Sequence, residues 1–130
     1  MTRMFKSGAT RNDSKDKLEF IRFNDPRVEK VYAYFMHKHR HLPDGTLREP
    51  DNWKLGFDDG VILDSRGRHF LDSWEIEKYG KAHRPDEPEV NQIETLCAEL
   101  FGIKAKLYEL VKDDKIYEEA LNYFNEKPKI

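Results

Sequence analysis

Apolar residues recur at intervals of three and four in four segments of the chain, the spacing that keeps side chains on one face of an α-helix. The segments run from about 26 to 39, 61 to 79, 93 to 111 and 114 to 124. The sequence shows no internal repeat, low-complexity tract or convincing hairpin signal. The pattern therefore predicts an all-α fold, a small bundle of about four helices.

Capping and helix-breaking residues set the limits of these helices. Asn24 or Asp25 before Pro26 predicts the start of the first, because a short polar side chain caps free N–H groups and proline suits a first turn. Gly80 predicts the end of the second helix, and Asp113 and Asp114 can cap the fourth. A loop of ten or more residues follows the first helix, and residues 81–89, with two prolines, form a linker before the third.

The second and third segments carry the longest apolar rows, and these rows are the expected core. The second row comprises Leu63, Gly67, Phe70, Leu71 and Trp74. The third comprises Ile93, Leu96, Cys97, Leu100, Ile103, Leu107, Leu110 and Val111. Because the third row extends for about five turns, we expect this helix to be the central one.

Length and charge narrow the class of protein. The 130 residues fit one domain, with a basic leader and extended segment at 1–24, a helical domain at 25–125 and a polar tail at 126–130. Lysine and arginine number 23 against 25 acidic residues. This balance creates no field that would recruit DNA, so stable nucleic-acid binding is not expected. Without a membrane-length apolar stretch or a signal peptide, we expect a soluble, cytoplasmic protein.

A polar row lies beside the apolar row of the second helix. Its members, each about one turn from the next, are Asp64, Arg68, Asp72 and Glu75. Carboxylates on two antiparallel helices could meet, and Glu94 on the third helix is the expected counterpart. Mg²⁺ prefers such oxygen ligands and bridges nucleotide phosphates. The alternative is a surface ladder of helix-spaced ion pairs.

Histidine and tryptophan offer further chemistry. His69, three residues before Asp72, could serve as a base or a metal ligand, although a histidine beside an acid is common on ordinary helices. Trp53 could stack on a nucleotide base while Asn52 contacts the base edge. The competing interpretation of Trp53 is an aromatic plug over the end of the bundle.

Several of these residues belong to an ordered set of motifs between about Lys6 and Lys112. The motifs are Gly8-Ala9-Thr10-Arg11; Asp16-Lys17-Leu18-Glu19-Phe20; Asp51-Asn52-Trp53-Lys54-Leu55-Gly56; Leu63-Asp64-Ser65 with Arg68-His69-Phe70 and Trp74; and Glu94-Thr95-Leu96-Cys97-Ala98 with Phe101. In this order they resemble the phage-type dATP/dGTP diphosphohydrolase N-terminal domain family. That family is similar to the MazG-like and phosphoribosyl-ATP pyrophosphohydrolases, which are all-α.

The resemblance implies a MazG-like helical bundle, commonly a homo-oligomer, that binds Mg²⁺ or Mn²⁺ through acidic side chains. It further implies hydrolysis of a nucleoside triphosphate, with purine deoxynucleotides expected, to the monophosphate and pyrophosphate. In a phage-infected host cytoplasm, such an activity would change the deoxynucleotide pool.

The resemblance also assigns expected roles to individual residues. The expected catalytic residues are His69, Asp72 and Glu94. The metal carboxylates would be Asp72 and Glu94, with Asp64 and Glu75 as weaker candidates. The nucleotide would be bound by Lys17, Asn52, Trp53 and Arg68.

The sequence departs from the wider superfamily at its acidic motifs. Those enzymes typically pair Glu-x-x-Glu with Glu-x-x-Asp, and the nearest counterparts here are His69-x-x-Asp72 and Glu94-x-x-Cys97. Each motif has lost one acid, which leaves open the number of metals and catalysis itself. The main alternative is therefore a non-catalytic helical module with a degenerate metal site that binds a nucleotide or a protein. A purely structural or regulatory protein, with His69 and Trp74 in its core, is the third possibility.

Overall fold

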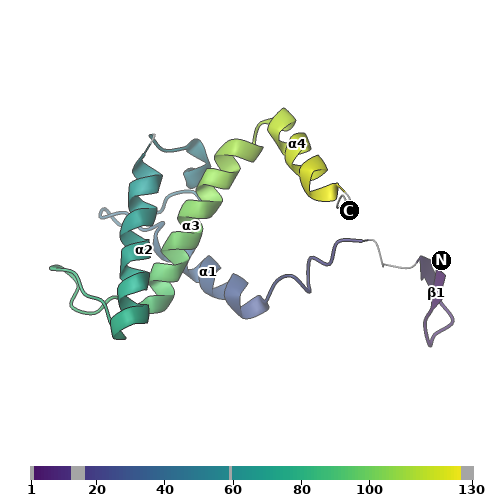
Figure 1. The fold of residues 1–130 in the computed structure, drawn as a ribbon, viewed down its shortest axis with the longest axis horizontal. Helices are drawn as coiled ribbons and strands as arrows, with labels where there is room; N and C mark the ends of the chain where they lie inside the picture. The colour runs from purple at the N-terminus through teal and green to yellow at the C-terminus, as the bar shows by residue number, and fades with distance from the viewer. Residues whose placement is uncertain (1, 13–16, 59, 127–130) are drawn as a thin grey trace. The chain divides into compact units, whose positions relative to one another are not determined.

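The computed structural model describes residues 2–12, 17–58 and 60–126. Within these ranges the chain is mostly helical, which confirms the predicted all-α class (Figure 1). The elements in chain order are β1 (Thr2–Met4), β2 (Thr10–Asn12), α1 (Pro26–Lys38), the 3-10 helix η1 (Asn52–Leu55), α2 (Val61–Tyr79), α3 (Gln92–Val111) and α4 (Asp114–Asn125). The chain divides into two compact units, Met1–Ala33 and Tyr34–Ile130.

The first unit contains a β-hairpin that the sequence pattern did not predict. Strands β1 and β2 pair antiparallel, with Arg3 opposite Arg11. The turn between them has no Asn-Gly or Asp-Gly signal, and Gly8 takes a positive φ of 89° there. The amide of Phe5 donates to the carbonyl of Ala9, which closes the hairpin. Residues 13–16 of the predicted basic leader lie outside the described residues.

The predicted start of the first helix is confirmed. Helix α1 begins at Pro26, and Oδ1 of Asp25 accepts hydrogen bonds from the amides of Arg27 at 2.8 Å and Val28 at 3.4 Å. These bonds satisfy two of the amides that a helix start leaves without partners. The last turn of α1, from Phe35 to Lys38, belongs to the second unit.

In the second unit, α2 and α3 form an antiparallel pair, and α3 also contacts η1 and α4 (Figure 1). Gly80 ends α2 with a φ of 82°, as predicted. Asn91 caps α3 by accepting from the amide of Glu94, and Asp113 caps α4 by accepting from the amide of Ile116. Helix α3 is therefore the central helix, as its long pattern predicted.

The expected core is confirmed at Cys97, which is buried, but it is wrong for most of the large apolar residues. The buried residues of α3 are Thr95, Cys97, Gly102 and Ala105, most of them small. The large apolar residues of the two predicted rows are exposed, namely Leu63, Phe70, Leu71 and Trp74 on α2 and Ile93, Leu96, Ile103, Leu107 and Leu110 on α3. The helices approach closely at Gly102, where an added Cβ would lie 2.4 Å from Cγ of Arg66. Small residues allow this approach, so the polar side of α2 faces α3.

The segment between α2 and α3 does more than connect them. Ala82 and Val90 are buried, and the amide of Val90 donates to the carbonyl of Ala82 at 2.9 Å. Arg84 and Glu87 form a short antiparallel bridge within the segment. These contacts hold the segment in a defined position, which the prediction of a plain linker did not anticipate.

The polar tail and the absence of a membrane-spanning segment were also predicted from the sequence, and the structure describes only part of the residues involved. Residues 127–130 of the predicted polar tail lie outside the described residues, beyond the end of α4 at Asn125. Among the described residues, none of the helices combines the length and apolar character that crossing a membrane requires.

Candidate functional site

A cleft of about 680 Å³ opens in the second unit. Four segments build it: the C-terminal end of α1, residues 48–57, the middle of α2, and the loop and first turns leading into α3. Its lining includes Phe35, Met36, His39, Arg40, Arg48, Glu49, Pro50, Asn52, Trp53, Phe57, Ser65, His69, Arg84, Glu87, Val90, Asn91, Glu94, Thr95, Ala98 and Phe101. The volume lies within the range of ligand sites for small molecules.

One side of the cleft is aromatic. Trp53 packs edge to face against Phe101, with ring centroids 6.4 Å apart, and against Tyr108 at 5.2 Å. Phe57 packs against Phe101 in the same manner at 6.1 Å. These contacts fix the indole through its neighbours, and Asn52 lies beside it on η1. An aromatic ring held in this way next to an amide can accept a planar, heterocyclic ligand.

Two arginines line another part of the cleft. Nε of Arg40 donates to the carbonyl of Arg48 at 2.7 Å, and Nη1 of Arg48 donates to the carbonyl of His39 at 2.7 Å. The amide of Arg48 in turn donates to the carbonyl of Arg40 at 2.8 Å. Among the described residues neither guanidinium forms an ion pair, so the hydrogen bonds position both groups without neutralising them. They are suited to bind an anion.

Glu94 is the carboxylate on the α3 side of the cleft. Its Oε1 lies 2.7 Å from Nζ of Lys38 and 3.5 Å from Nε2 of His39. The hydrogen bond from Lys38 holds the pKa of Glu94 below its ordinary value. The Glu94 side chain keeps 38% of its surface exposed, so a ligand can reach it. This ionised carboxylate is therefore accessible, and Lys38 is its present partner.

Asp72, Arg84 and His69 form a second cluster beside the cleft. Nε of Arg84 donates to Oδ2 of Asp72 at 2.9 Å, and Nη2 donates to the same oxygen. Nη2 of Arg84 also lies 3.4 Å from Nδ1 of His69. The Asp72 side chain is only 14% exposed. The cluster thus places a partly buried carboxylate behind an arginine and a histidine that both line the cleft.

The charges in this cluster affect protonation. Burial, and then the positive charge of Arg84, hold the pKa of His69 below its ordinary value. Hydrogen bonding to Asp72 raises the pKa of Arg84. Because a guanidinium only donates, Nδ1 of His69 must accept, and the neutral ring then carries its proton on Nε2. His69 is therefore arranged as a hydrogen-bond donor at neutral pH, and its expected role as a base stays a prediction.

The structure brings together some of the residues singled out in the sequence. His69, Glu94, Asn52 and Trp53 all line the cleft, and Asp72 adjoins it through Arg84. Asp64, Arg68 and Glu75 are not among the lining residues, and Lys17 belongs to the first unit. The functional roles of all these residues stay predictions.

Sequence reasoning missed the basic residues of the cleft. They are Arg40, Arg48 and Arg84, which come from irregular segments. Lys38, at the end of α1, was also missed and pairs with Glu94. The available signal was the position of Arg48 and Arg84 close before Pro50 and Pro85, where proline limits the freedom of the loop. A cation on a restrained loop could have been considered as a ligand group.

The acidic and histidine side chains of the cleft can be compared with the ligands that a magnesium site needs. No group of three or more histidine, cysteine or acidic side chains gathers at one point in the part of the chain that the structure describes. Mg²⁺ usually takes one or two carboxylates and completes its shell with substrate phosphates and water. Glu94 alone among the four predicted metal carboxylates lines the cleft, so the cleft offers one of them to a metal.

Comparisons with protein-family models, with curated proteins and with solved structures found no match.

Proposed function

We propose that this chain binds a nucleoside triphosphate in the cleft and hydrolyses it to the monophosphate and pyrophosphate in the presence of Mg²⁺. The observation that carries the proposal is the meeting of three groups in one cleft of about 680 Å³. They are a fixed tryptophan, an accessible carboxylate and two arginines that form no ion pair with any described residue. Each of these groups matches one part of a nucleotide. Purine deoxynucleoside triphosphates are the proposed substrates, on the strength of the sequence resemblance.

The aromatic side supports binding of the base. Trp53 offers an indole held by Phe101 and Tyr108, and base stacking on such a ring contributes about 1–3 kcal/mol. The amide of Asn52 can both donate and accept a hydrogen bond at a base edge. Stacking tolerates every base, so any preference for purines depends on such edge contacts.

The basic side supports binding of the phosphates. Arg40 and Arg48 present guanidinium groups whose fork geometry matches phosphate oxygens. His69 can donate from Nε2 to a further phosphate oxygen. The chain would thus neutralise and orient the triphosphate from two sides of the cleft.

Glu94 is the residue that would hold the metal, with Mn²⁺ as an alternative ion. When bound, the metal neutralises charge on the phosphates and polarises the phosphoryl group. In the reaction a water oxygen bonds to the α-phosphorus, and the bond from that phosphorus to the bridging oxygen breaks. Pyrophosphate leaves with the electron pair, and the proton of the water passes to solvent.

A second candidate function is nucleotide binding without hydrolysis. Each of the two leading metal carboxylates already has a cationic partner, Asp72 with Arg84 and Glu94 with Lys38. If these ion pairs persist when a nucleotide binds, neither of the two leading carboxylates is free to hold a metal. The same cleft would then serve as a binding module.

The test is an incubation of the purified chain with each deoxynucleoside triphosphate and Mg²⁺, following monophosphate and pyrophosphate. Glu94→Gln should lower kcat by about 100-fold or more. Glu89→Gln, which changes an exposed carboxylate outside the cleft, is the matched control and should leave kcat unchanged. Nucleotide binding is measured in parallel through Trp53 fluorescence, with Trp53→Phe as a further variant.

The two candidates give different results. Release of pyrophosphate that needs Mg²⁺ and Glu94 supports hydrolysis. Binding of a nucleotide that Arg48→Met weakens, with no turnover, supports the binding module. If the chain neither binds nor hydrolyses any of the nucleotides, both proposals are contradicted.

A further inference from the structure

The β-hairpin of the first unit carries a local charge that the balance of the whole chain conceals. Residues 2–12 contain Arg3, Lys6 and Arg11 and no aspartate or glutamate, whereas the complete chain has a formal net charge of −2. Residues 2–11 are all exposed. The hairpin is therefore a small basic surface that is open to solvent (Figure 1).

The pairing of the strands gathers two of these cations and an aromatic ring on one face. Arg3 lies directly opposite Arg11, so both side chains leave the same face of the hairpin. The guanidinium carbon of Arg3 lies 5.2 Å from the ring centroid of Phe5, which places Phe5 on that face as well. These three residues are here called the arginine face. Met4, which is 77% exposed, belongs to the opposite face, because side chains alternate along a strand.

The arginine face is unfavourable for the hairpin on its own. Like charges directly opposite each other destabilise a pair of strands, and a hairpin of two strands is at best marginally stable in water. Among the described residues of the first unit, the two strands pack only on each other. An anion bound across Arg3 and Arg11 would remove the repulsion and stabilise the hairpin.

We propose that the arginine face binds single-stranded nucleic acid, with phosphates on Arg3 and Arg11 and a base stacked beside Phe5. A guanidinium binds phosphate oxygens through its fork of donors, and both aromatic rings and guanidinium planes stack on bases. The expectation of no stable nucleic-acid binding was derived from the charge of the whole chain. Two or three cations on one hairpin give a weaker complex that depends strongly on salt.

Two other polyanions fit this face less well. A bilayer of anionic lipid favours apolar side chains that insert together, but Met4 and Phe5 lie on opposite faces of the hairpin. An acidic peptide offers carboxylates but no base that could stack on Phe5 or on the guanidinium plane of Arg3. Charge complementarity together with stacking therefore favours nucleic acid.

The first experiment titrates the full chain into a fluorescent oligothymidylate and follows the anisotropy. EDTA removes divalent cations, so the outcome does not depend on the proposed hydrolysis. Arg3→Gln combined with Arg11→Gln should weaken binding by about tenfold or more. Lys78→Gln combined with Lys81→Gln removes the same charge from exposed positions of the second unit and is the matched control. Equal losses in the two double variants, or no binding by the parent chain, would overturn the proposal.

The cleft of the second unit is a competing location for the oligonucleotide. Arg48→Met removes a cation of the cleft and should leave the affinity for oligothymidylate unchanged, because the hairpin belongs to the other unit. Loss of binding in Arg48→Met, with full binding in the double arginine variant, would place the oligonucleotide in the cleft and refute the role of the hairpin.

Salt dependence examines the contacts with phosphates. Two or three phosphate contacts on a single strand predict that binding weakens by about tenfold when salt rises from about 50 to about 200 mM. Binding that does not respond to salt would contradict ion pairing at the two arginines.

Gly8→Val examines whether the folded hairpin is needed. Gly8 has a φ of 89°, where other side chains are strained, and an added Cβ would meet no atom within 4 Å. The substitution therefore disfavours the turn without changing any charge, and binding should weaken by about threefold or more. An affinity equal to that of the parent chain would mean that an unpaired basic segment binds, which overturns the role of the hairpin.

Phe5→Leu examines the choice of partner. The substitution keeps an apolar side chain but removes the ring, so binding of oligothymidylate should weaken by about fivefold or more. Binding of heparin, a polyanion without bases, should not change. Tighter binding to phosphatidylserine vesicles or to polyglutamate than to the oligonucleotide would identify a different partner and overturn the proposal.

Discussion

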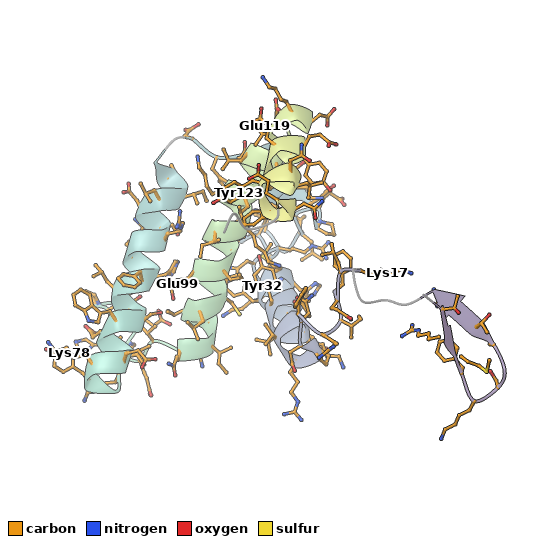
Figure 2. All side chains as sticks on the ribbon, turned by 45° about the vertical axis from the view of Figure 1, so that its right-hand side comes forward. Lys17, Tyr32, Lys78, Glu99, Glu119 and Tyr123 are labelled. Atoms are coloured by element: carbon orange, nitrogen blue, oxygen red, sulfur yellow. The ribbon has the colours of Figure 1, made fainter. Side chains whose placement is uncertain are left out.

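The two sides of the α2–α3 pair differ in a way that reverses the usual distribution of side chains. The side where the helices meet holds polar and small residues, including His69, Asp72 and Ser73 from α2 and Thr95 from α3. The outward side holds large apolar residues, such as Phe70 and Trp74, which pack on each other with ring centroids 6.2 Å apart. Figure 2 shows Glu99 among the polar groups between the helices.

This reversal is informative because polar groups are costly to enclose. A partly buried carboxylate such as Asp72 is stable only when it is paired, and Arg84 supplies the partner. Exposed apolar area on the other side is equally unfavourable unless something covers it. We therefore propose ligand chemistry for the inner side, whereas the outer side carries exposed apolar area. Four experiments would break or sharpen this comparison.

The largest effect is expected at Arg84, which positions His69. Arg84→Met should lower kcat/KM for the proposed reaction by up to about 100-fold, because loss of the Asp72 pair lets the histidine shift. Removing the cation while Asp72 remains should also raise the pKa of His69. The acidic limb of the pH profile should then move to higher pH. Lys81→Met, in the same loop and exposed, is the control, and an unchanged pH profile in Arg84→Met would contradict this role.

The second-largest effect is expected on stability, at the close contact between α2 and α3. Gly102→Ala should reduce the free energy of unfolding by about 1–3 kcal/mol, since its Cβ would lie 2.4 Å from Cγ of Arg66. Gly67→Ala on α2 meets no atom within 4 Å and should stabilise the helix by up to about 1 kcal/mol. Denaturant unfolding of both variants measures the difference. Equal effects at the two glycines would mean that the helices pack less tightly than the structure shows.

A smaller effect is expected when the free energy of unfolding is measured at different pH values. The ordinary pKa of His69 is 6.5, and its pKa in the folded chain lies below that value. As pH falls below about 7, the unfolded chain therefore binds a proton at His69 more readily than the folded chain does, and stability decreases. Glu94, whose folded pKa is also lowered, adds its loss only at more acidic pH, near and below 4.5. Between pH 7.5 and 5.5, the free energy of unfolding should decrease less steeply with falling pH in His69→Gln than in the parent chain.

The smallest effect is expected on the outer side of α2. Leu71 is 58% exposed, so Leu71→Gln should change the free energy of unfolding by no more than about 0.5 kcal/mol. A buried leucine would instead lose about 2–5 kcal/mol on truncation. Chemical denaturation of a preparation diluted to low concentration provides the measurement. A loss of the larger size would show that this side of α2 is covered after all.

Local signals predicted the helices well. Asp25 before Pro26, Gly80 and Asp113 all act where the sequence placed them, because capping depends on residues within one turn of the helix end. The hairpin at the start of the chain was missed, since its turn lacks a standard signal and depends on the positive φ of Gly8. The loop from Lys81 to Glu89 was underrated for a similar reason, because its order comes from the burial of Ala82 and Val90.

The candidate site was predicted only in part. Asn52, Trp53, His69 and Glu94 were singled out in the sequence and share the cleft, but their roles still depend on the proposed reaction. The arginines were not predicted, because Arg40, Arg48 and Arg84 are separated along the chain and meet only through folding. Ion pairs such as Lys38 with Glu94 likewise join residues more than fifty positions apart.

The amino-acid sequence by itself determined the helical class, the limits of the helices and the periodic rows of side chains, since all three depend on interactions within a few residues. Only the tertiary structure decided which row faces inward. The small residues Gly102 and Ala105 let α2 approach α3 closely, and that contact turns His69 and Asp72 toward the site and the leucines of α3 toward solvent. Periodicity shows that a helix has an apolar face, but it does not show which neighbour will cover that face.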